Sequence, residues 1–413
     1  MGGHDHGGTV TRPAQALAIL AASALLATGC AKTGDDGAPD AESGLNDIPV
    51  QTSIDVPADA VTAAGDGKAK CADTTTIGYA GAMTGPNAQL GINIYNGVQL
   101  AIDQHNKANP DCQVAFKKFD TEGDPTKATG PVTQVVNDDS IVGVIGLPFS
   151  GESKATGQIF EDAGLVHITP SATNPDLAKN GWTTFHRGMG NDAVQGPTVA
   201  VIAKKLGAER VYVVGDDSDY GIGLFKTSTE ALGSMLIGKD KVTTGQKDFS
   251  ATISKILNAK ADAVFYSGYY AEGAPLDQQL VAKGFKGAFI GPDGVKDDEF
   301  VKQAGSSSNN AYFTCPCIPG ELIPDFADAY KKAFKNKAPG TYSIEGYDTA
   351  IVLLQGIDKG NTTRPKLLSF VEDYSGQGYA KSYKWGEDGE LTDTPVFGYK
   401  VDDGKFVSIG QLH

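Results

Sequence analysis

Two hydroxyl side chains stand just beyond the ends of two expected strands in the stretch Gly143–Leu177. Ser150 follows the apolar run Ile141–Ile145, and Thr173 follows the run Val166–Thr169. Ligands of open α/β sheets bind beyond the carboxyl ends of the strands, so both hydroxyls are candidates for ligand contact. The helix start at Ser150 also offers free backbone N–H groups, which suit an anion. Serine and threonine are common helix caps as well, and the local pattern leaves both interpretations open.

Patterns typical of catalysis are thin. No G-x-S-x-G motif surrounds Ser150, no P-loop is present, and Gly221–Gly223 is too short for a dinucleotide fingerprint. Asp216–Asp219 resembles the start of a calcium loop, but Tyr220 stands where an oxygen ligand is needed. Three histidines are scattered, which favours structural roles: His105, His167 and His186. We therefore expect no catalytic residue, no metal and no cofactor.

An alternation of strands and helices must position these residues. Strand and helix patterns alternate from Thr75 to Leu206, and the alternation starts again at Arg210 and continues to Thr314. Strands joined by helices of this length predict parallel, doubly wound sheets. We therefore expect an α/β fold of two Rossmann-like lobes with parallel-type sheets, and a ligand site in the cleft between them.

Composition and the N-terminus indicate where the protein works. The 413 residues suggest two or three domains, and the net charge of −15 without a basic patch argues against nucleic acid. Arg12 precedes the short apolar run Ala14–Ala27, which ends at a sequence similar to a bacterial lipobox with Cys30 as its cysteine. We expect residues 1–30 to be a lipoprotein signal peptide and Cys30 to be lipidated, with an ordinary secretory signal as the alternative.

Residues 31–70 are rich in Gly, Ala, Asp and Pro and show neither a helical nor a strand period. They are expected to form a disordered acidic tether that spans roughly 35 Å root-mean-square. The predicted location is extracytoplasmic, with a lipid anchor to the cell membrane through Cys30.

Four cysteines remain after Cys30, an even number that predicts disulfides in an exported chain. Cys71 and Cys112 each precede an expected strand, so they are within bridging reach if those strands are neighbours. Cys315 and Cys317 would close a small strained ring, and two free thiols are the alternative.

Eight segments, in consistent order from Cys71 to the C-terminus, resemble the leucine/isoleucine/valine-binding proteins. These are type I periplasmic binding proteins of branched-chain amino-acid ABC importers. The segments are GAMTGPNAQLG at 81–91, GLPFSGES at 146–153, ITPSATNP at 168–175, QGP at 195–197, YGIGL at 220–224, KDFSATI at 247–253, YSGYYAEGA at 266–274 and GPDGV at 291–295.

The resemblance implies how the head group of an amino acid would be bound. The family serine that holds the α-carboxylate, together with backbone N–H groups, corresponds to Ser150, and a threonine contacting the same head group corresponds to Thr173. The carbonyl that accepts from the ammonium falls on Ser171, and the acidic ammonium partner falls on Asp293. The family often has Glu at that last position, and the alternative for Asp293 by itself is a residue of a Pro-Asp-Gly turn.

The resemblance also implies the walls of the pocket. Tyr269 and Tyr220 match aromatic residues of the family cleft, although ordinary packing explains them equally well. Leu90 falls where the family has an aromatic residue, and Phe149 falls where a related protein has a small one. A reshaped apolar pocket separates ligands that differ by one methylene by only roughly 1–3 kcal/mol, so the identity of the amino acid stays open.

In this family the chain crosses between the lobes three times, near Gly188–Asp192, Thr314–Gly320 and Glu387–Asp393 here, which makes a three-stranded hinge. A bridge between Cys315 and Cys317 would stiffen it. The expected first lobe is 71–190 plus 318–388, and the second is 191–317 plus 389–413.

The expected function is that of a substrate-binding lipoprotein, not an enzyme. It would capture a free amino acid, branched-chain or otherwise apolar, by cleft closure and present it to the permease subunits of an ABC importer, as a monomer. The alternatives are a binding component of a sensor or signalling system, or an importer component for amides, urea or aromatic acids. Asp293 argues against ligands that lack a cation.

Overall fold

The computed structural model describes residues 45–71 and 75–413. The expected signal peptide with Cys30, and the expected tether before residue 45, lie outside the described residues. Within those two described ranges, no helix is both long and apolar enough to span a bilayer. The described residues belong to one compact unit, Glu42–His413.

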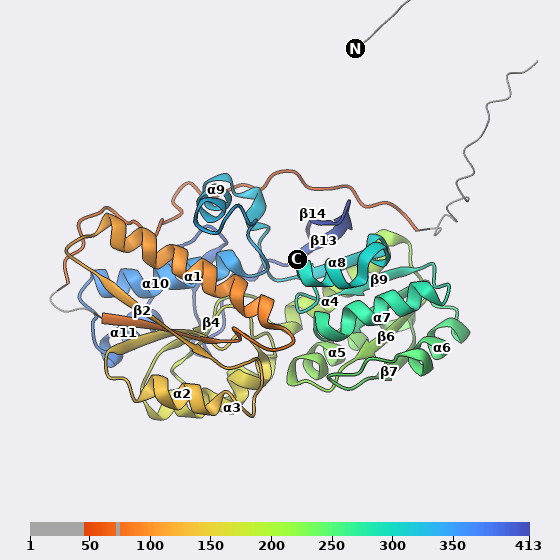
Figure 1. Cartoon of the computed structure of the whole chain (residues 1–413), viewed down its shortest axis with the longest axis horizontal. Helices are drawn as coiled ribbons and strands as arrows, with labels where there is room; N and C mark the ends of the chain where they lie inside the picture. The colour runs from red at the N-terminus through yellow and green to blue at the C-terminus, as the bar shows by residue number, and fades with distance from the viewer. Residues whose placement is uncertain (1–44, 72–74) are drawn as a thin grey trace, which may run out of the picture. The chain divides into compact units, whose positions relative to one another are not determined.

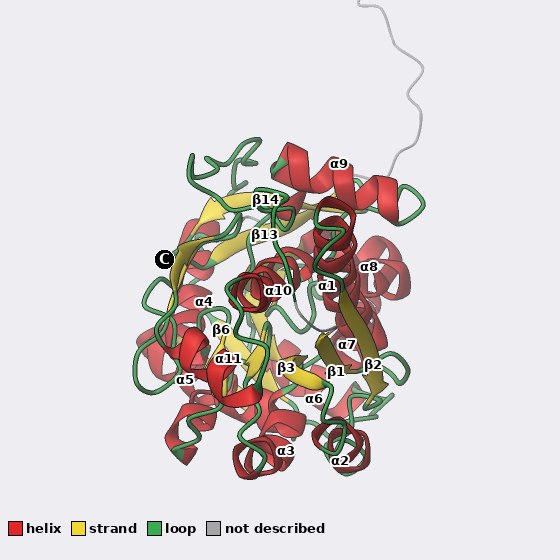
Figure 2. Cartoon of the chain, turned by 90° about the vertical axis from the view of Figure 1, so that its left-hand side faces the viewer, coloured by secondary structure: helices red, strands yellow, loops and turns green. Residues whose placement is uncertain are grey.

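Five parallel strands form the sheet of the first lobe, in the order β2 (Val114–Asp120), β1 (Thr75–Gly81), β3 (Ile141–Gly146), β4 (His167–Thr169) and β5 (Phe185–Arg187). Helices α1 (Ala88–Ala108) and α10 (Ser343–Asp358) cover one face, and α2 (Thr129–Val136) and α3 (Ser150–Asp162) cover the other (Figures 1 and 2). Because helices cover both faces, β1 and β3 are buried over their whole length and appear in the sequence as apolar runs.

The first lobe is completed by one short helical turn between β4 and β5 and by later segments of the chain. Helix α9 packs on α1, and α11 packs on β3. These elements are η1 (Pro175–Asn180), η4 (Gly320–Leu322), α9 (Pro324–Ala333), α11 (Arg364–Glu372) and the antiparallel pair β11 (Ser375–Gln377) and β12 (Ser382–Lys384).

Seven strands form the sheet of the second lobe, in the order β14 (Lys405–Gln411), β13 (Phe397–Asp402), β10 (Ala311–Cys315), β9 (Ala288–Gly291), β8 (Ala263–Ser267), β6 (Val211–Gly215) and β7 (Leu236–Lys241). The strands from β10 to β7 pair in parallel, as expected, whereas β13 and β14 are antiparallel. The turn Asp403–Gly404 has positive φ at both residues (47° and 70°), which is typical of the tight turn of an antiparallel hairpin.

The helices and short helical turns of the second lobe connect these strands. They are α4 (Asp192–Leu206), α5 (Asp219–Leu232), η2 (Gly233–Met235), α6 (Ser250–Asn258), α7 (Tyr270–Ala282), α8 (Asp298–Ala304) and η3 (Gly305–Asn310).

The chain passes between the two sheets three times. The first passage is 188–191, between β5 and α4; the second is 316–319, after β10; and the third is 385–396, between β12 and β13. Disulfides join Cys315 to Cys317 beside the second passage, and Cys71 to Cys112 at the start of the first lobe.

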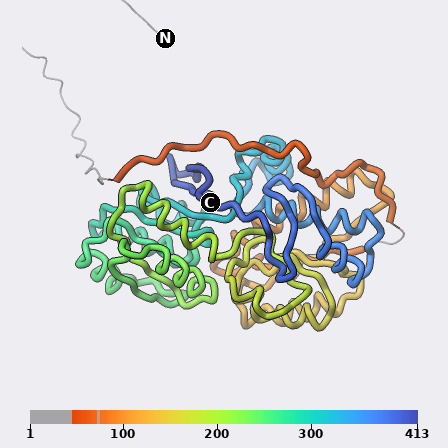
Figure 3. Tube along the Cα trace, turned by 180° about the vertical axis from the view of Figure 1, so that it is seen from behind, coloured from red at the N-terminus to blue at the C-terminus, as the bar shows by residue number. Residues whose placement is uncertain are grey.

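Residues 45–71, here called the strap, differ from the expectation of a free tether. They form neither helix nor strand, but they run along both lobes (the red-orange tube of Figure 3). The strap buries Ile48 and Ala63, each 4% exposed, so isolated apolar residues anchor a segment that has no apolar period. Backbone hydrogen bonds join it to both lobes: Asn46 N–H to Leu206 O (2.9 Å), Gln51 N–H to Ser408 O (2.7 Å), Val61 N–H to Gln377 O (3.0 Å) and Cys71 N–H to Asp111 O (3.1 Å).

Candidate ligand site between the lobes

A small cavity of about 10 Å³ lies where the two lobes meet. That is about the space that one buried water needs, so in this closed form the two lobes pack closely around the cavity. Six of the eight expected ligand residues line it. The lining residues are Leu90, Pro148, Phe149, Ser171 and Tyr342 from the first lobe, and Tyr220, Tyr269, Asp293 and Gly294 from the second.

Asp293 follows β9 and is 3% exposed. Its Oδ1 accepts hydrogen bonds from Tyr220 OH (2.6 Å) and Gln195 Nε2 (2.6 Å), and its Oδ2 accepts one from Tyr342 OH (2.9 Å). Burial raises the pKa of this carboxyl, and the three hydrogen bonds oppose that rise. All three donors are neutral, so they orient the carboxylate without neutralising its charge. A cation that enters the cavity would favour the ionised form.

Two loops of the first lobe face Asp293 across the cleft, and hydroxyl groups hold them together. The Thr169 hydroxyl donates to Leu147 O (2.7 Å), and the Ser171 hydroxyl donates to Pro148 O (2.8 Å). Gly146 begins the first of these loops with φ +136°, and a Cβ there would lie 2.0 Å from Ala80 O. Only glycine fits this close approach of two strands.

Ser150 and Thr173 do not line the cavity itself. Ser150 is the first residue of α3 rather than its N-cap, and its Oγ accepts from Asn174 N–H (3.2 Å). The hydroxyl of Thr173 is buried and makes no hydrogen bond of ordinary geometry, although its interaction with the Asp192 carboxyl opposes the rise that burial causes in the pKa of that group. A ligand could supply a better partner. The structure therefore brings both residues beside Ser171, but one layer away from the cavity.

Three aromatic rings form the apolar wall. Tyr269 lies between Phe149 of the first lobe and Tyr220 of its own lobe, with ring centroids 5.0 Å from each. The Phe149–Tyr269 pair is edge-to-face (83°), a favourable arrangement that also joins the lobes.

Sequence reasoning gave no role to three of the lining residues, Pro148, Gly294 and Tyr342, or to Gln195, which bonds Asp293. Gln195 lies in one of the eight family-like segments, but that segment carried no role. Tyr342 has φ +63°, a conformation that tyrosine rarely adopts, so no local pattern predicts that it turns toward Asp293.

The two lobes touch across the mouth of the cleft, so this is a closed form. Asn93 Nδ2 donates to Asp297 Oδ2 (2.9 Å), and Lys154 pairs with Asp219 (2.7 Å). Gln89 N–H donates to the hydroxyl of Tyr270 (3.2 Å).

Two buried carboxyls flank the site without lining it. No hydrogen bond of ordinary geometry reaches the carboxyl oxygens of Glu152, in the first turn of α3, or of Asp192, at the start of α4. The hydroxyls of Thr121 and Thr173, respectively, lie beside them and partly oppose the effect of burial on their pKa values. Burial raises the pKa of each to about 8. Both are therefore mostly neutral at pH 7.

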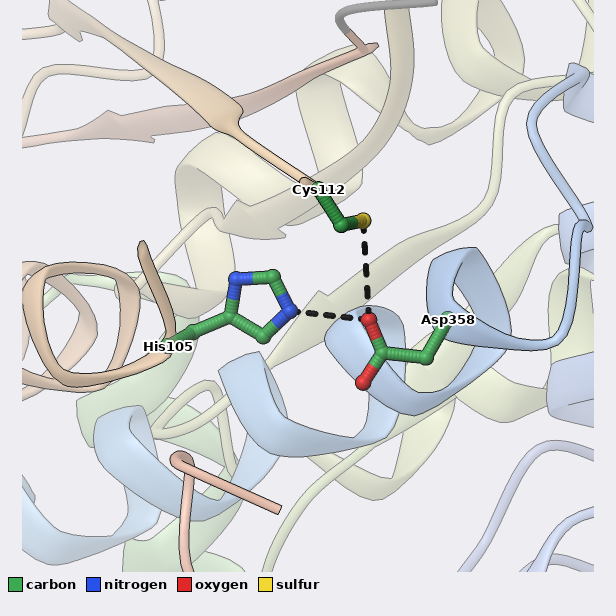
Figure 4. Close-up of side chains that lie close together, drawn as sticks. All are labelled: His105, Cys112 and Asp358. Carbon is green, nitrogen blue, oxygen red and sulfur yellow. Dashed lines mark hydrogen bonds and ion pairs between the residues drawn. The ribbon is translucent and has the colours of Figure 1, made fainter. Parts of the chain in front are cut away.

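One cluster of metal-ligating residue types lies away from the cleft (Figure 4). His105 Nε2 is 2.8 Å from Asp358 Oδ1, and Cys112 Sγ is 3.8 Å from the same oxygen. Burial lowers the pKa of His105, but its hydrogen bonds with Asp358 and Asn106 outweigh this and raise it. The Cys112 sulfur is bonded to Cys71 and is not a thiolate, which is the form that binds metal. The remaining imidazole and carboxylate are too few for a structural zinc site.

Comparison with known proteins identifies relatives. The family model for periplasmic binding proteins matches residues 74–405. The Leu/Ile/Val-binding protein of Escherichia coli (strain K12) is 34% identical over 331 residues, which cover 78% of this chain and 89% of that protein. A leucine-, isoleucine-, valine-, threonine- and alanine-binding protein of Pseudomonas aeruginosa is 33% identical over 307 residues, covering 72% of this chain and 82% of that protein.

Solved structures give the same picture. The branched-chain amino acid transporter substrate binding protein LivJ from Streptococcus pneumoniae, in complex with isoleucine, has a TM-score of 0.76 and 25% identity, covering 81% of this chain and 98% of that one. A solute binding protein from R. palustris in complex with benzoate has a TM-score of 0.74 at 18% identity, covering 82% and 96%, and shows a likeness of fold alone.

Proposed function

Since the chain belongs to the periplasmic binding protein family, we propose that it is the extracytoplasmic substrate-binding component of an ABC importer for amino acids. Its ligand is a branched-chain or other apolar amino acid, which the cleft encloses as the lobes close. The names of the relatives support this class of ligand and its delivery to membrane permease subunits. The protein binds its ligand and catalyses no reaction on it.

One observation carries the proposal: the buried carboxylate of Asp293 in a closed cavity, oriented by three neutral donors. A zwitterionic amino acid needs an opposite charge for its ammonium, because a buried bare charge is costly. Asp293 supplies that charge from the second lobe. The ligand carboxylate is held from the first lobe by Ser150, Thr173 and the backbone N–H groups at the start of α3, and the carbonyl of Ser171 accepts from the ammonium.

The remaining lining residues select the side chain. Leu90 and Phe149 of the first lobe and Tyr269 of the second enclose an apolar group, with Tyr220 beside Asp293. Only closure brings both halves of the site to one ligand, which couples binding to rotation about the three passages. Cys30, lipidated at the membrane, anchors the protein.

A thermal-shift screen tests this proposal. The chain from residue 31 onward, with Cys30 omitted, is melted alone and with each amino acid, urea, short amides and benzoate. A ligand at 100 times its Kd stabilises the native form by about 2.7 kcal/mol, which raises the melting temperature. We expect leucine, isoleucine or valine to give the largest shift. A shift with benzoate or urea and none with any amino acid would refute the proposed ligand class.

A further inference from the structure

We propose that Arg187 is a positioning residue of the ligand site. It bonds the loop 171–174 on the side away from the cavity, and through Glu390 it connects this loop to the third passage. The proposal rests on the proposed function, in which the loop 171–174 belongs to the half of the site that holds the ligand carboxylate. Arg187 itself does not line the cavity.

The guanidinium of Arg187 is fully buried and uses four contacts on two sides. On one side it donates to the carbonyl oxygens of Ala172 and Asn174, the latter at 3.0 Å. On the other side its Nε and Nη2 donate to the two carboxylate oxygens of Glu390, both at 2.9 Å. Its side chain is 0% exposed and that of Glu390 is 17% exposed.

The two carbonyls bonded by Arg187 belong to the residues on either side of Thr173. Fixing both peptide groups fixes the backbone of Thr173, whose own carbonyl accepts from Asp192 N–H (2.9 Å). The planar fork of arginine spans two acceptors at once, and an ammonium, which is a point charge, cannot reproduce this geometry. Arg187 therefore determines where the Thr173 hydroxyl and the neighbouring backbone groups point.

Glu390 lies in the third passage, and this segment docks on Arg187 by its backbone as well. Arg187 N–H donates to Gly389 O (2.9 Å), and Trp385 Nε1 donates to Arg187 O (2.6 Å). A rotation of the lobes must move part of this passage. The ion pair therefore transmits hinge position to the loop, so that the loop takes its ligand-holding geometry together with closure.

A second arginine provides a matched control. Arg364 also donates to three backbone carbonyls, those of Ile141, Val136 and Asp138, each at 3.0 Å. Ile141 is the first residue of β3, whereas the cleft loop follows the last residue of that strand. Arg364 therefore makes the same kind of contact at the end of the strand far from the cavity.

The test compares Arg187→Lys and Arg364→Lys in the mature chain. Leucine affinity is measured by calorimetry, and amide hydrogen exchange is followed in the peptide that contains residues 171–174. We expect Arg187→Lys to weaken leucine binding by about tenfold or more, a factor equivalent to about 1.4 kcal/mol. We also expect faster exchange in that peptide, and neither change in Arg364→Lys.

Glu390→Gln serves as a second variant, because it keeps an acceptor for Arg187 and removes only the negative charge of the pair. We expect it to weaken leucine binding less than Arg187→Lys, and in the same direction. Unchanged affinity in both Arg187→Lys and Glu390→Gln overturns the proposal. If the wild-type protein binds no amino acid, the proposed function fails. Amide hydrogen exchange still tests the role of Arg187 in that case, because exchange rates at residues 171–174 that are the same in the variants as in the wild type would overturn it.

Discussion

Replacing Asp293 by asparagine separates the charge of this side chain from its shape. The amide oxygen still accepts from Tyr220 and Gln195, which lie 2.6 Å from Oδ1 in the structure. The hydroxyl of Tyr342 can reorient to accept from the new amide group. What the variant loses is the negative charge opposite the ligand ammonium.

The magnitude follows from burial. Truncating one partner of a buried, hydrogen-bonded charge pair costs about 2–5 kcal/mol. Because about 1.4 kcal/mol corresponds to a factor of ten, the Kd should rise by about 30-fold to several thousandfold. The stability of the ligand-free protein should not fall with this substitution. Burial raises the pKa of Asp293, so its ionised form destabilises the folded protein at neutral pH. We expect ligand-free Asp293→Asn to melt no lower than wild type at pH 7.

Calorimetry with leucine, or with the ligand that the screen identifies, measures the change. Asp240→Asn is the control, because Asp240 is a carboxylate of β7 that pairs with Lys255 at 2.9 Å on the far edge of the second sheet. Its loss should leave the affinity unchanged. An unchanged Kd in Asp293→Asn would refute the assignment of the ammonium site, and a lower ligand-free melting temperature would refute the electrostatic reasoning.

Three further predictions concern pH, the strap and the hinge. Burial raises the folded-state pKa of Glu152 to about 8, so its stabilising contribution is complete below about pH 4.3, the ordinary pKa of Glu, and is lost as the pH rises through 8. Urea unfolding at pH 4.5, 6 and 8 should show a smaller decline in stability for Glu152→Gln than for wild type, and an equal decline would contradict this. Ile48→Ala should destabilise the ligand-free protein by about 2–4 kcal/mol if the strap is packed as described, whereas the exposed Val50→Ala should change stability by less than about 0.5 kcal/mol. Equal unfolding curves for the two variants would mean that the strap does not stabilise the fold. Mild reduction of the Cys315–Cys317 bridge should change the rate of ligand-induced closure, measured by stopped-flow fluorescence. Mass spectrometry shows whether the bridge is open. An unchanged closure rate in protein with an open bridge would rule out a stiffening role.

The apolar runs were sufficient to predict the sheets, because a strand covered on both faces must be apolar along its length. The C-terminal hairpin is the informative exception. Its strands pair antiparallel, and the Asp403–Gly404 turn that produces this is a recognisable local signal that the strand pattern alone did not use. The strap was mistaken for a free tether because single apolar residues such as Ile48 give no period, although each can fill a groove of the folded body.

The same distinction applies to the site, where some residues could be predicted from the sequence and others could not. Ser171 and Asp293, which line the cavity, were placed through the resemblance to the family, whereas the ending of parallel strands at one edge of a sheet indicated Ser150 and Thr173. Two contacts between distant segments could not be placed from the sequence. One of the two hydroxyls that orient Asp293 belongs to Tyr342, 49 residues later, and the carboxylate that pairs with Arg187 belongs to Glu390, 203 residues later.

The sequence by itself determined the α/β class and the two lobes, because periodicity and strand ends are local properties, and its resemblance to the family supplied the chemical types expected at the cleft. The tertiary structure alone decided which carboxyls are buried without a hydrogen bond of ordinary geometry, which hydroxyls line the cavity and which stand one layer behind, and that an arginine joins the ligand loop to a passage between the lobes. Those features depend on distances between segments far apart in the chain, and burial and hydrogen bonding change the chemistry of a side chain only once such segments are packed together.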